Sequence, residues 1–515
     1  MPFKYLENVK HILEFKDFRK NLSKEQKRLL LTIIKKNQNT VYGKKYNFKK
    51  IRSVEDFRKF VPIISFEDID KYVERLKKGE NNVLTKDKVV FFATTSGSTK
   101  KPKFIPVTKQ RRISFKKELS IWSFNFLRKY PQVLNGKLLY FAGPYLEGET
   151  PSGIMFGSIS GYLVHKSSWF VKKKLVIPPK IYNESDFDKK MHVIAKLAIR
   201  KRVSQIGFAF PVEVLMFFDY LKKNKQSLIK ELKEDGHFFK ARALVKKDFS
   251  PLSLWPMLKV VNCIMSEANK PYLDKLKKKL PGVLINDPGI YCSEGRISIS
   301  LKPGSSEGMV SVTTNFFEFK DVESGELFLA HELILGRKYK VIMTTPEGLY
   351  RYDMGDVVEV VGFKGDVPLI NFFERSNYLN LVGELAHEKV LLESVEEVIK
   401  KSGIKLRAFT FMPFSNEKKP RYNLLIEPNV KLDKVSAKKF IKLVDEFLQK
   451  NIRDYMQMRN EFGRLDFPVL SVARRGSYDD FDKKRISKGG QQKPIIIAKD
   501  STFLDNFDLD FQVIL

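Results

Sequence analysis

The sequence predicts an α/β fold in which a parallel sheet is covered by helices. Short apolar runs, each about the length of a buried strand, alternate with segments of helical periodicity; three of these runs are KLLYFAG, QIGFAF and MLKVVNCIM. Repeated alternation of strand and helix is typical of parallel sheets. The chain has 515 residues, too many for one simple core, so we expect two or more domains.

Helices are expected over most of the first 85 residues. One helix begins near Leu22, with Ser23 as a candidate N-cap and Gln26 three residues later. A second begins near Ser53, with Asp56 three residues later. A serine followed at that distance by an amide or acidic residue is the pattern of a capped helix start. Helical spacing returns over residues 110–130 and 211–233.

The pattern of apolar runs changes from residue 296. Short strands separated by turns follow, and they predict a sheet or small barrel: RISISL, MVSVTTNFFEF, ELFLA, KYKVIMTT, VVEVVGF and PLINFFE. After about residue 376 a smaller α+β unit is expected. RAFTFMPF and RYNLLIEP are predicted to pair as strands, and residues 435–456 have one apolar face of a long helix.

Composition excludes several classes of protein. Apolar residues make up 43% of the chain, so disorder of the whole chain is not expected. Two cysteines give no disulfide framework, which fits a cytoplasmic location. The start of the chain lacks the apolar core of a signal peptide, and no run reaches the roughly 18 apolar residues of a membrane span.

The formal net charge is +34. The lysines are dispersed along the chain, and no zinc-finger or RNP pattern is present, so a solvated basic surface without a dedicated nucleic-acid partner is expected. Weak association with an anionic membrane surface stays open as an alternative. The sequence does not indicate the oligomeric state.

A loop rich in small hydroxyl residues follows the apolar run VVFFA. It reads TTSGSTKKPK and contains Thr95, Ser96, Gly97, Ser98 and Thr99. Backbone N–H groups in such a loop can approach phosphate oxygens closely, and lysines as far as position 103 add positive charge. The loop is neither a Walker A motif nor a dinucleotide fingerprint. An ordinary Ser/Thr-rich turn is the alternative.

Two further segments place carboxylates at strand ends. YCSEG offers the ring of Tyr291, the hydroxyl of Ser293 and the carboxylate of Glu294, a set suited to a base, a phosphate and Mg²⁺. GLYRYDMGDVV places Asp356 directly before an apolar run, where it could accept hydrogen bonds from ribose hydroxyls. Plain turns are the alternatives at both segments.

Two basic residues complete the set of candidates. Arg375 ends the β-rich section and could reach a phosphate or form a surface ion pair. Lys493 lies in GGQQKP near the C-terminus, where a loop lysine could approach a developing negative charge. A chain with 94 basic residues makes a solvated lysine the ordinary interpretation of any one of them.

In this order, these segments resemble the Gretchen Hagen 3 family of acyl acid amido synthetases. That family belongs to the adenylate-forming superfamily of acyl-CoA ligases, luciferases and peptide-synthetase adenylation domains. The resemblance runs through most of the chain, from NTVYGKKYNF and TTSGSTKKPKFIPVT through YCSEG. Its most specific stretches are HELILGRKYKVIMTTPEGLYRYDMGDVVEVVGF and PLINFFERSNYLNLVGELAHEKV. The chain is shorter than the plant members and resembles compact microbial ones.

The resemblance implies a fold of two domains. Residues 1–375 would form an N-terminal ATP- and acyl-substrate-binding domain, built of parallel sheets, helices and a small β-barrel-like section. Residues 376–515 would form a smaller, mobile α+β lid domain. Glu384 and Glu388 match the family's Gly-Glu-x-x-x-Glu segment at the start of that lid.

The resemblance also implies roles for individual residues. Glu294, Arg375 and Lys493 would be catalytic, and Glu294 would also hold Mg²⁺. ATP would be bound by a larger set: Thr95, Ser96, Gly97, Ser98, Thr99, Lys103, Tyr291, Ser293, Asp356 and Arg375. The chain departs from the family at Lys100 and Lys101, where glycine is frequent, at Asp353, and in the spacing around Lys493.

The implied reaction has two steps. A carboxylic acid attacks the α-phosphorus of ATP to give an acyl-adenylate and pyrophosphate, and an amine, expected to be an amino acid, then forms an amide and releases AMP. Two alternatives stay open: a ligase that transfers the acyl group to a thiol such as CoA, and a basic binding protein with a retired ATP site. The sequence does not identify the acid, the amine or a general base.

Overall fold

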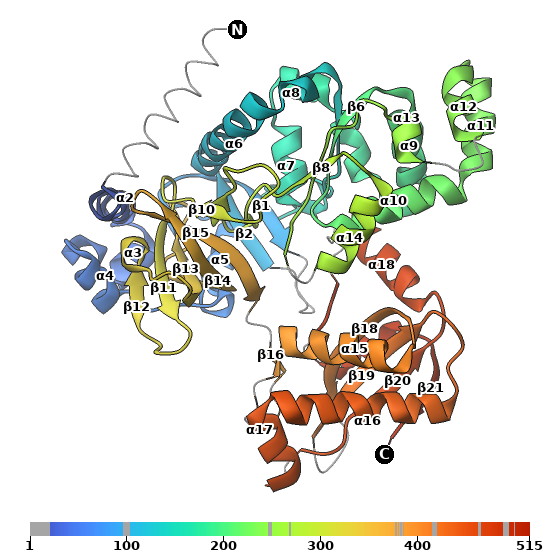
Figure 1. Ribbon diagram of the computed structural model, residues 1–515. Coiled ribbons are helices and arrows are strands. Elements are labelled where there is room, and N and C mark those ends of the chain that lie inside the picture. The colour runs from blue at the N-terminus through green and yellow to red at the C-terminus, as the bar shows by residue number, and fades with distance from the viewer. Residues whose placement is uncertain are drawn as a thin grey trace. The chain divides into compact units, whose positions relative to one another are not determined.

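The computed structural model describes residues 21–514, apart from 96–102, 246–249, 267–268, 376–377, 380, 382–383, 385, 415–419, 462–464, 488–493 and 499. The described residues form two compact units (Figure 1). The first unit ends at Phe373, and Glu374 begins the second. The expected functional division at residues 375 and 376 stays a prediction.

A four-stranded parallel sheet lies in the first unit, in the order β3-β6-β7-β8. Its strands are β3 (Lys137–Tyr140), β6 (Val203–Gly207), β7 (Val260–Asn262) and β8 (Leu284–Asn286). The connecting segments carry the helices α7 (Ile159–His165), α8 (Trp169–Lys174), α9 (Phe187–Arg200), α10 (Pro211–Lys223), α11 (Lys225–Glu234), α12 (Phe238–Val245), α13 (Pro251–Leu254) and α14 (Lys270–Lys279). The predicted α/β class is therefore confirmed.

A second four-stranded sheet contains the strand that precedes the hydroxyl-rich loop. Its order is β2-β1-β5-β4, with strands β1 (Val89–Thr95), β2 (Lys103–Thr108), β4 (Gly148–Glu149) and β5 (Met155–Gly157). β1 and β2 are antiparallel, whereas β1 and β5 are parallel. The long helix α6 (Lys109–Lys129) follows β2 at once, and Thr108 caps it by accepting a hydrogen bond from the backbone N–H of Arg111.

The predicted β-rich section forms a seven-stranded sheet in the order β12-β11-β13-β14-β15-β10-β9. Its strands are β9 (Ser298–Ile299), β10 (Gly308–Val310), β11 (Phe316–Asp321), β12 (Leu327–Leu329), β13 (Lys338–Thr344), β14 (Tyr352–Lys364) and β15 (Val367–Arg375). Between β13 and β14 the register shifts, because Ile342 pairs with Asp353 but Lys340 pairs with Val357. The shift makes β14 bulge over residues 354–356.

The N-terminal helices share one hydrophobic core with this sheet. They are α2 (Leu22–Asn37), α3 (Val41–Lys45), α4 (Val54–Phe60) and α5 (Phe66–Lys77). The capping box of Ser53 and Asp56 on α4 is confirmed. The N-cap predicted at Ser23 is wrong, because α2 already begins at Leu22, whose side chain is buried in the core.

Two buried polar contacts join these helices to the later part of the chain. The amide of Gln26 donates to the carbonyl oxygens of Val312 and Asn315 at 2.6 and 3.0 Å. The hydroxyl of Tyr350 donates to the carbonyl of Leu84 at 2.7 Å, and its ring stacks on that of Tyr42. The GLYRY segment is thus anchored to the N-terminal helices.

The second unit is α+β, as predicted. Its four-stranded sheet has the order β18-β19-β20-β21, with strands β18 (Leu406–Phe414), β19 (Arg421–Pro428), β20 (Val469–Ala473) and β21 (Leu509–Val513). Short strands β16 (Tyr378–Leu379) and β17 (Ala386–His387) precede the helices α15 (Glu388–Ser402), α16 (Lys434–Asn451), α17 (Arg453–Met456) and α18 (Ser477–Ser487). The predicted pairing of β18 with β19 is confirmed.

The helix predicted over residues 435–456 is interrupted. α16 ends at Asn451, and Ile452 has extended backbone angles of φ −126° and ψ 102°. The chain resumes as α17, whose Tyr455 donates a hydrogen bond of 2.6 Å to the buried carboxylate of Asp445 on α16. The apolar periodicity continues across the break, which is why the sequence pattern did not reveal it.

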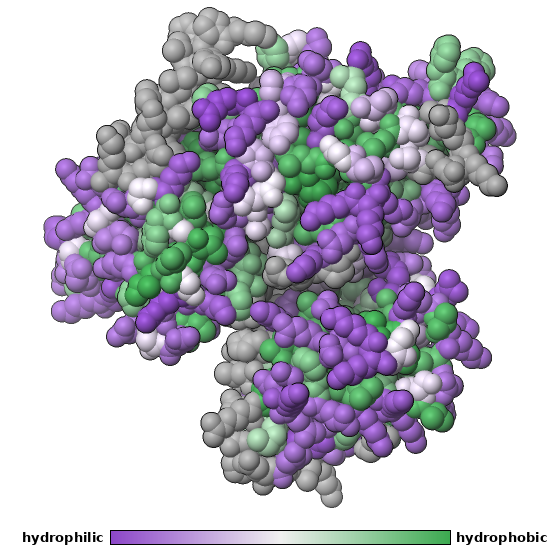
Figure 2. Space-filling model, in the orientation of Figure 1, coloured by the Kyte–Doolittle hydropathy of each residue, from purple (hydrophilic) through white to green (hydrophobic). Residues whose placement is uncertain are grey.

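Apolar side chains on the face shown in Figure 2 form separate patches among hydrophilic residues. Among the described residues, no helix has the length and apolar composition needed to cross a membrane.

Candidate active site

The hydroxyl-rich loop joins the ends of two paired strands. Thr95 is the last residue of β1 and Lys103 the first of β2, and the two are partners in the antiparallel register. The ammonium group of Lys103 lies 5.4 Å from the ring centroid of Phe66. The predicted phosphate-binding residues Ser96, Gly97, Ser98 and Thr99, with Lys100 and Lys101, lie outside the described residues.

The YCSEG segment forms a tight turn. The backbone N–H of Cys292 donates to the carbonyl of Gly295 at 2.9 Å, and Tyr291 forms an antiparallel bridge with Arg296. Ser293 and Glu294 are therefore at the tip of the turn, and both side chains are half-buried. The Glu294 carboxylate accepts no hydrogen bond within the part of the chain that the structure describes.

Asp356 belongs to the bulge of β14, and its side chain is only 3% exposed. Gly355 before it has φ 67°, a left-handed conformation that glycine adopts without a Cβ clash. The carboxylate of Asp353 accepts a hydrogen bond of 2.8 Å from the N–H of Gly355 and so holds the bulge. A bulge interrupts the regular alternation of side chains between the two faces of a strand. The direction of the Asp356 side chain is therefore set by the bulge.

Glu294 and Asp356 converge on one thiol. Burial raises the pKa of Cys292, and the negative charges of Glu294 and Asp356 raise it further, whereas Arg111 lowers it. These charges act on the thiol because they lie near it. Two carboxylates from segments far apart in the sequence, and a guanidinium from α6, thus lie in the same region of the first unit.

A cluster of buried charges adjoins this point, and the sequence interpretation missed it. Glu118 on α6 is fully buried, and its Oε2 lies 4.0 Å from Arg111 Nη1 and 3.9 Å from Arg296 Nε. Its Oε1 accepts hydrogen bonds from the hydroxyls of Thr314 and Ser311 at 2.5 and 3.3 Å. Arg111 and Glu118 have the i, i+7 spacing that places them on one face of α6, which is the only signal the sequence carried.

Glu347 adds an unusual carboxylate to the same region. It is 3% exposed, and neither of its oxygens has a hydrogen-bond partner among the described residues. Burial raises its pKa, and the positive charge of Arg111 opposes that rise. Buried polar atoms are normally hydrogen-bonded, so this carboxylate, which within the described part of the chain only the Thr345 hydroxyl and its own backbone N–H approach, can still accept a hydrogen bond from water or a polar ligand group.

Arg296 links the cluster to the YCSEG turn. Its guanidinium donates to the carbonyl of Pro288 at 2.7 Å and lies 5.3 Å from the ring centroid of Tyr291. This contact holds the Tyr291 ring in place. Asp287, which directly follows β8, lies upstream of this turn, and its carboxylate accepts hydrogen bonds from the backbone N–H groups of Met265 and Gly289, each at 2.7 Å.

The other predicted site residues fall in the second unit or outside the description. Arg375 is the last residue of β15 and belongs to the second unit. Lys493 lies outside the described residues. Glu384 is fully buried in the second unit and accepts hydrogen bonds from the Tyr422 hydroxyl and the Leu381 N–H at 2.9 and 2.8 Å. Glu388 is the first residue of α15.

No group of three or more His, Cys, Asp or Glu suited to a metal ion occurs within the described residues. Glu294 fits a different kind of metal site. Mg²⁺ is often held by one or two carboxylates together with substrate phosphates and water, and the half-buried Glu294 carboxylate, which has no hydrogen-bond partner within the described residues, would suit such a site.

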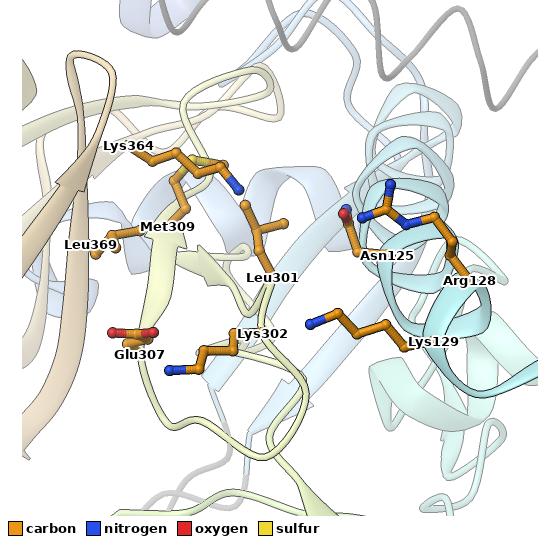
Figure 3. Close-up of a pocket in the computed structure, with 9 residues that line it drawn as sticks. All are labelled: Asn125, Arg128, Lys129, Leu301, Lys302, Glu307, Met309, Lys364 and Leu369. Carbon is orange, nitrogen blue, oxygen red and sulfur yellow. The ribbon is translucent and has the colours of Figure 1, made fainter.

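A separate pocket of about 300 Å³ lies in the first unit (Figure 3). Its lining is rich in cationic side chains and consists of Asn125, Arg128, Lys129, Leu301, Lys302, Glu307, Met309, Lys364 and Leu369. Neither Glu294 nor Asp356 belongs to this lining, so the pocket is distinct from the carboxylates described above.

The fold defines the class of protein first. A solved 2-hydroxyisobutyryl-CoA ligase in its post-adenylation state superposes with a TM-score of 0.51 at 11% identity, covering 88% of each chain. A solved GH3.15 acyl acid amido synthetase superposes with a TM-score of 0.83 at 20% identity, covering 97% of this chain and 95% of that one. The fold is therefore that of the adenylate-forming enzymes.

Three family models then match most of the sequence. They are the GH3 family N-terminal domain over residues 11–238, the central domain over 308–375 and the C-terminal domain over 389–502. The chain therefore belongs to the GH3 family of acyl acid amido synthetases. The resemblance inferred from the motifs is confirmed, as is the expected class of AMP-forming acid–amino acid ligase.

Curated relatives agree with this assignment. The jasmonoyl–L-amino acid synthetase JAR6 of Nicotiana attenuata is 25% identical over 77% of this chain and 77% of its own length. The indole-3-acetic acid-amido synthetase GH3.4 of Arabidopsis thaliana is 24% identical over 75% of this chain and 73% of its own length.

Proposed function

We propose that this chain joins a small carboxylic acid to an amino acid at the expense of ATP. The names of its relatives support this reaction, since they describe amide synthesis between an acid, jasmonate or indole-3-acetate, and an amino acid or amine. A solved relative was obtained with the acid 2,4-DB. At about a quarter identity, these names support the type of reaction and leave the acid of this chain to be identified.

The structural support for the proposal is that the negative charges of Glu294 and Asp356 both raise the pKa of the Cys292 thiol, so the two carboxylates lie in one region of the first unit. If one carboxylate holds the Mg²⁺ of ATP and another accepts the ribose hydroxyls of ATP, both must contact the same nucleotide and so must lie close together. Their common neighbour supports a single site. The loop after β1, with Ser96 to Thr99, is proposed to hold the phosphates, and the Tyr291 ring to lie against adenine.

In the first step, the acid's carboxylate oxygen attacks the α-phosphorus of ATP and pyrophosphate leaves. The attacking oxygen is already anionic, so the protein needs alignment and positive charge more than a base. Glu294 would hold Mg²⁺, which neutralises phosphate charge when bound. Lys103, at the start of β2, and Arg375 are proposed to contribute further positive charge.

In the second step, a neutral amine attacks the activated carbonyl and AMP leaves. Residues 376–515 are proposed to act as a lid that changes position between the steps, with Lys493 serving only adenylation.

The role proposed for Lys493 predicts that its loss affects only the first step. A Lys493→Ala variant should lose ATP–pyrophosphate exchange, yet it should still convert supplied acyl-adenylate to amide. Exchange at the parent rate would remove Lys493 from the mechanism.

The reaction itself is tested with the purified full-length chain. A panel of carboxylic acids is screened by pyrophosphate release, and the best acid is then incubated with ATP and either amino acids or CoA. Mass spectrometry should find an acyl–amino acid and AMP. A thioester as the product would establish the acid–thiol ligase, and no pyrophosphate release with any acid would favour a retired site.

Cys263 and Cys292 are free thiols, which supports a cytoplasmic location.

A further inference from the structure

The short helix α8, labelled in Figure 1, belongs to the first unit and carries neighbouring apolar side chains that are exposed. Trp169 is 64% exposed, Phe170 56% and Val171 47%. The two aromatic rings contact each other edge to face, with 5.1 Å between their centroids. Neighbouring large apolar side chains that stay exposed indicate a place where another surface binds.

Leu134 extends this group. It is 48% exposed, and the ammonium group of Lys174, at the end of α8, donates to its carbonyl oxygen at 2.6 Å. The α8 surface is therefore defined by its apolar side chains and by the lysines among them: Leu134, Trp169, Phe170, Val171, Lys137, Lys172, Lys173, Lys174 and Lys201.

The lysines of the α8 surface lie close to one another. The ammonium group of Lys137 donates to the carbonyl of Lys173 at 2.6 Å. Burial lowers the pKa of Lys137, and the positive charges of Lys201, Lys174 and Lys173 lower it further. Among the described residues, none of the five lysines forms an ion pair with a carboxylate. The α8 surface therefore combines exposed apolar side chains with uncompensated positive charge.

We propose that the α8 surface binds membranes that contain anionic lipids. Trp and Phe side chains are suited to the boundary between headgroups and acyl chains, where apolar surface is buried and lysines meet anionic headgroups. Lys173 and Trp169 bring a cation and an aromatic ring together on this surface, because the ammonium group of Lys173 lies 4.8 Å from the ring centroid of Trp169. The aliphatic Val171 and Leu134 favour a lipid surface over nucleic acid, whose bases stack on rings and planar guanidinium groups.

The proposal does not rest on the acid–amino acid ligase reaction, because no residue of α8 is among those assigned to ATP. It also gives part of the net charge of +34 a specific use. The binding is expected to be reversible and sensitive to salt, since exposed charges are screened over about 8 Å at physiological ionic strength.

The experiment uses the intact protein and vesicles of phosphatidylcholine with or without phosphatidylglycerol. Cosedimentation should show binding to the anionic vesicles and several-fold weaker binding to neutral ones. Trp169 also reports its own insertion, because it is the exposed one of three tryptophans, Trp122 being half-buried and Trp255 buried. Its fluorescence should shift to the blue on binding, and brominated lipid should quench it.

Two variants separate the apolar and the cationic contributions. Trp169→Ser with Phe170→Ser, and Lys172→Glu with Lys173→Glu and Lys174→Glu, should each lower the partition coefficient about tenfold or more. The matched control is Lys277→Glu with Lys278→Glu and Lys279→Glu, which changes an exposed lysine run at the end of α14 by the same charge. Lys172 is half-buried and the other positions changed are exposed, so the Tm of each variant should stay close to the parent value.

An equal loss of binding in the α14 control would show that net charge alone attracts the protein to vesicles, and would overturn the assignment to α8. Absence of binding to anionic vesicles would do the same. A doubled mass in light scattering that the Trp169 and Phe170 variant abolishes would assign the surface to a second copy of the chain, and tighter binding to RNA than to vesicles would assign it to nucleic acid.

Discussion

Arg351 holds both carboxylate oxygens of Glu318, with its Nε 2.8 Å from Oε2 and its Nη2 3.1 Å from Oε1. Both side chains are almost fully buried, and Arg58 from α4 donates to the same carboxylate at 2.9 Å. Arg351 has φ 49°, a left-handed conformation that a residue with a Cβ adopts at a cost. The ion pair therefore fixes the backbone immediately before the strand that carries Asp356.

Glu318→Gln should destabilise the first unit by about 3–5 kcal/mol, because it leaves the buried Arg351 without its anionic partner. Chemical denaturation of the purified protein measures the change. Glu80→Gln is the matched control, since Glu80 pairs with Arg75 at an exposed position and should leave the free energy of unfolding almost unchanged. Equal effects of the two variants would contradict the structural role of Glu318.

Tyr422→Phe should destabilise the second unit by about 1–3 kcal/mol. It removes a hydroxyl that donates to the fully buried carboxylate of Glu384, which then keeps only its remaining partners. Amide hydrogen exchange should speed up in β18 and β19 and stay unchanged in β3 and β6. Faster exchange in both units would show that the hydroxyl supports more than its own unit.

If Asp356 accepts the ribose hydroxyls as proposed, Asp356→Asn should lower kcat/KM for ATP in pyrophosphate exchange by roughly 10- to 100-fold, since it removes that charged acceptor. Asp353→Asn is the matched control in the same bulge. Asparagine keeps an oxygen acceptor for the N–H of Gly355, so this variant should stay within about threefold of the parent. A larger loss in Asp353→Asn than in Asp356→Asn would assign the bulge, and not Asp356, to ATP binding.

Asp287 should make stability depend on pH. Burial raises its pKa from 3.8 to about 6, although two backbone N–H groups stabilise the carboxylate. The folded state thus holds the proton more tightly than the unfolded one. The stabilisation is complete below pH 3.8 and is lost as the pH rises through about 6, and its full size is about 3 kcal/mol.

The check compares the parent with Asp287→Asn, which is neutral throughout. Urea unfolding across the interval between pH 3.8 and about 6 should give a steeper loss of stability for the parent than for the variant. The variant also loses one backbone acceptor, which lowers its stability by an amount that does not depend on pH. Parallel pH profiles would show that Asp287 is already ionised at the bottom of this interval.

Local patterns predicted much of the fold. Strand-like apolar runs gave the parallel sheet and the β-rich section, and the capping box at Ser53 marked a helix start correctly. The N-cap at Ser23 failed because burial of Leu22 extended the helix by one residue. The break at Ile452 was invisible because the apolar face continues through it.

The sequence singled out Glu294 and Asp356 because Glu294 follows an apolar run, Asp356 precedes one, and each belongs to a recognisable motif. The buried charges Arg111, Glu118 and Glu347 were not found, because their contacts join segments far apart in the chain. Glu118, for example, meets Thr314 across 196 positions. A charged residue within a helix is normally solvated, so only the packed structure reveals that this one is buried.

The bond from Tyr350 to Leu84 has a consequence for synthesis on the ribosome. Its two ends are 266 residues apart. At about 5–20 residues per second, Leu84 leaves the ribosome roughly 13 to 50 seconds before Tyr350 does. During that interval the nascent helices α2 to α5 expose apolar surface that belongs against the unfinished sheet, so this segment is where a chaperone should be found on stalled chains.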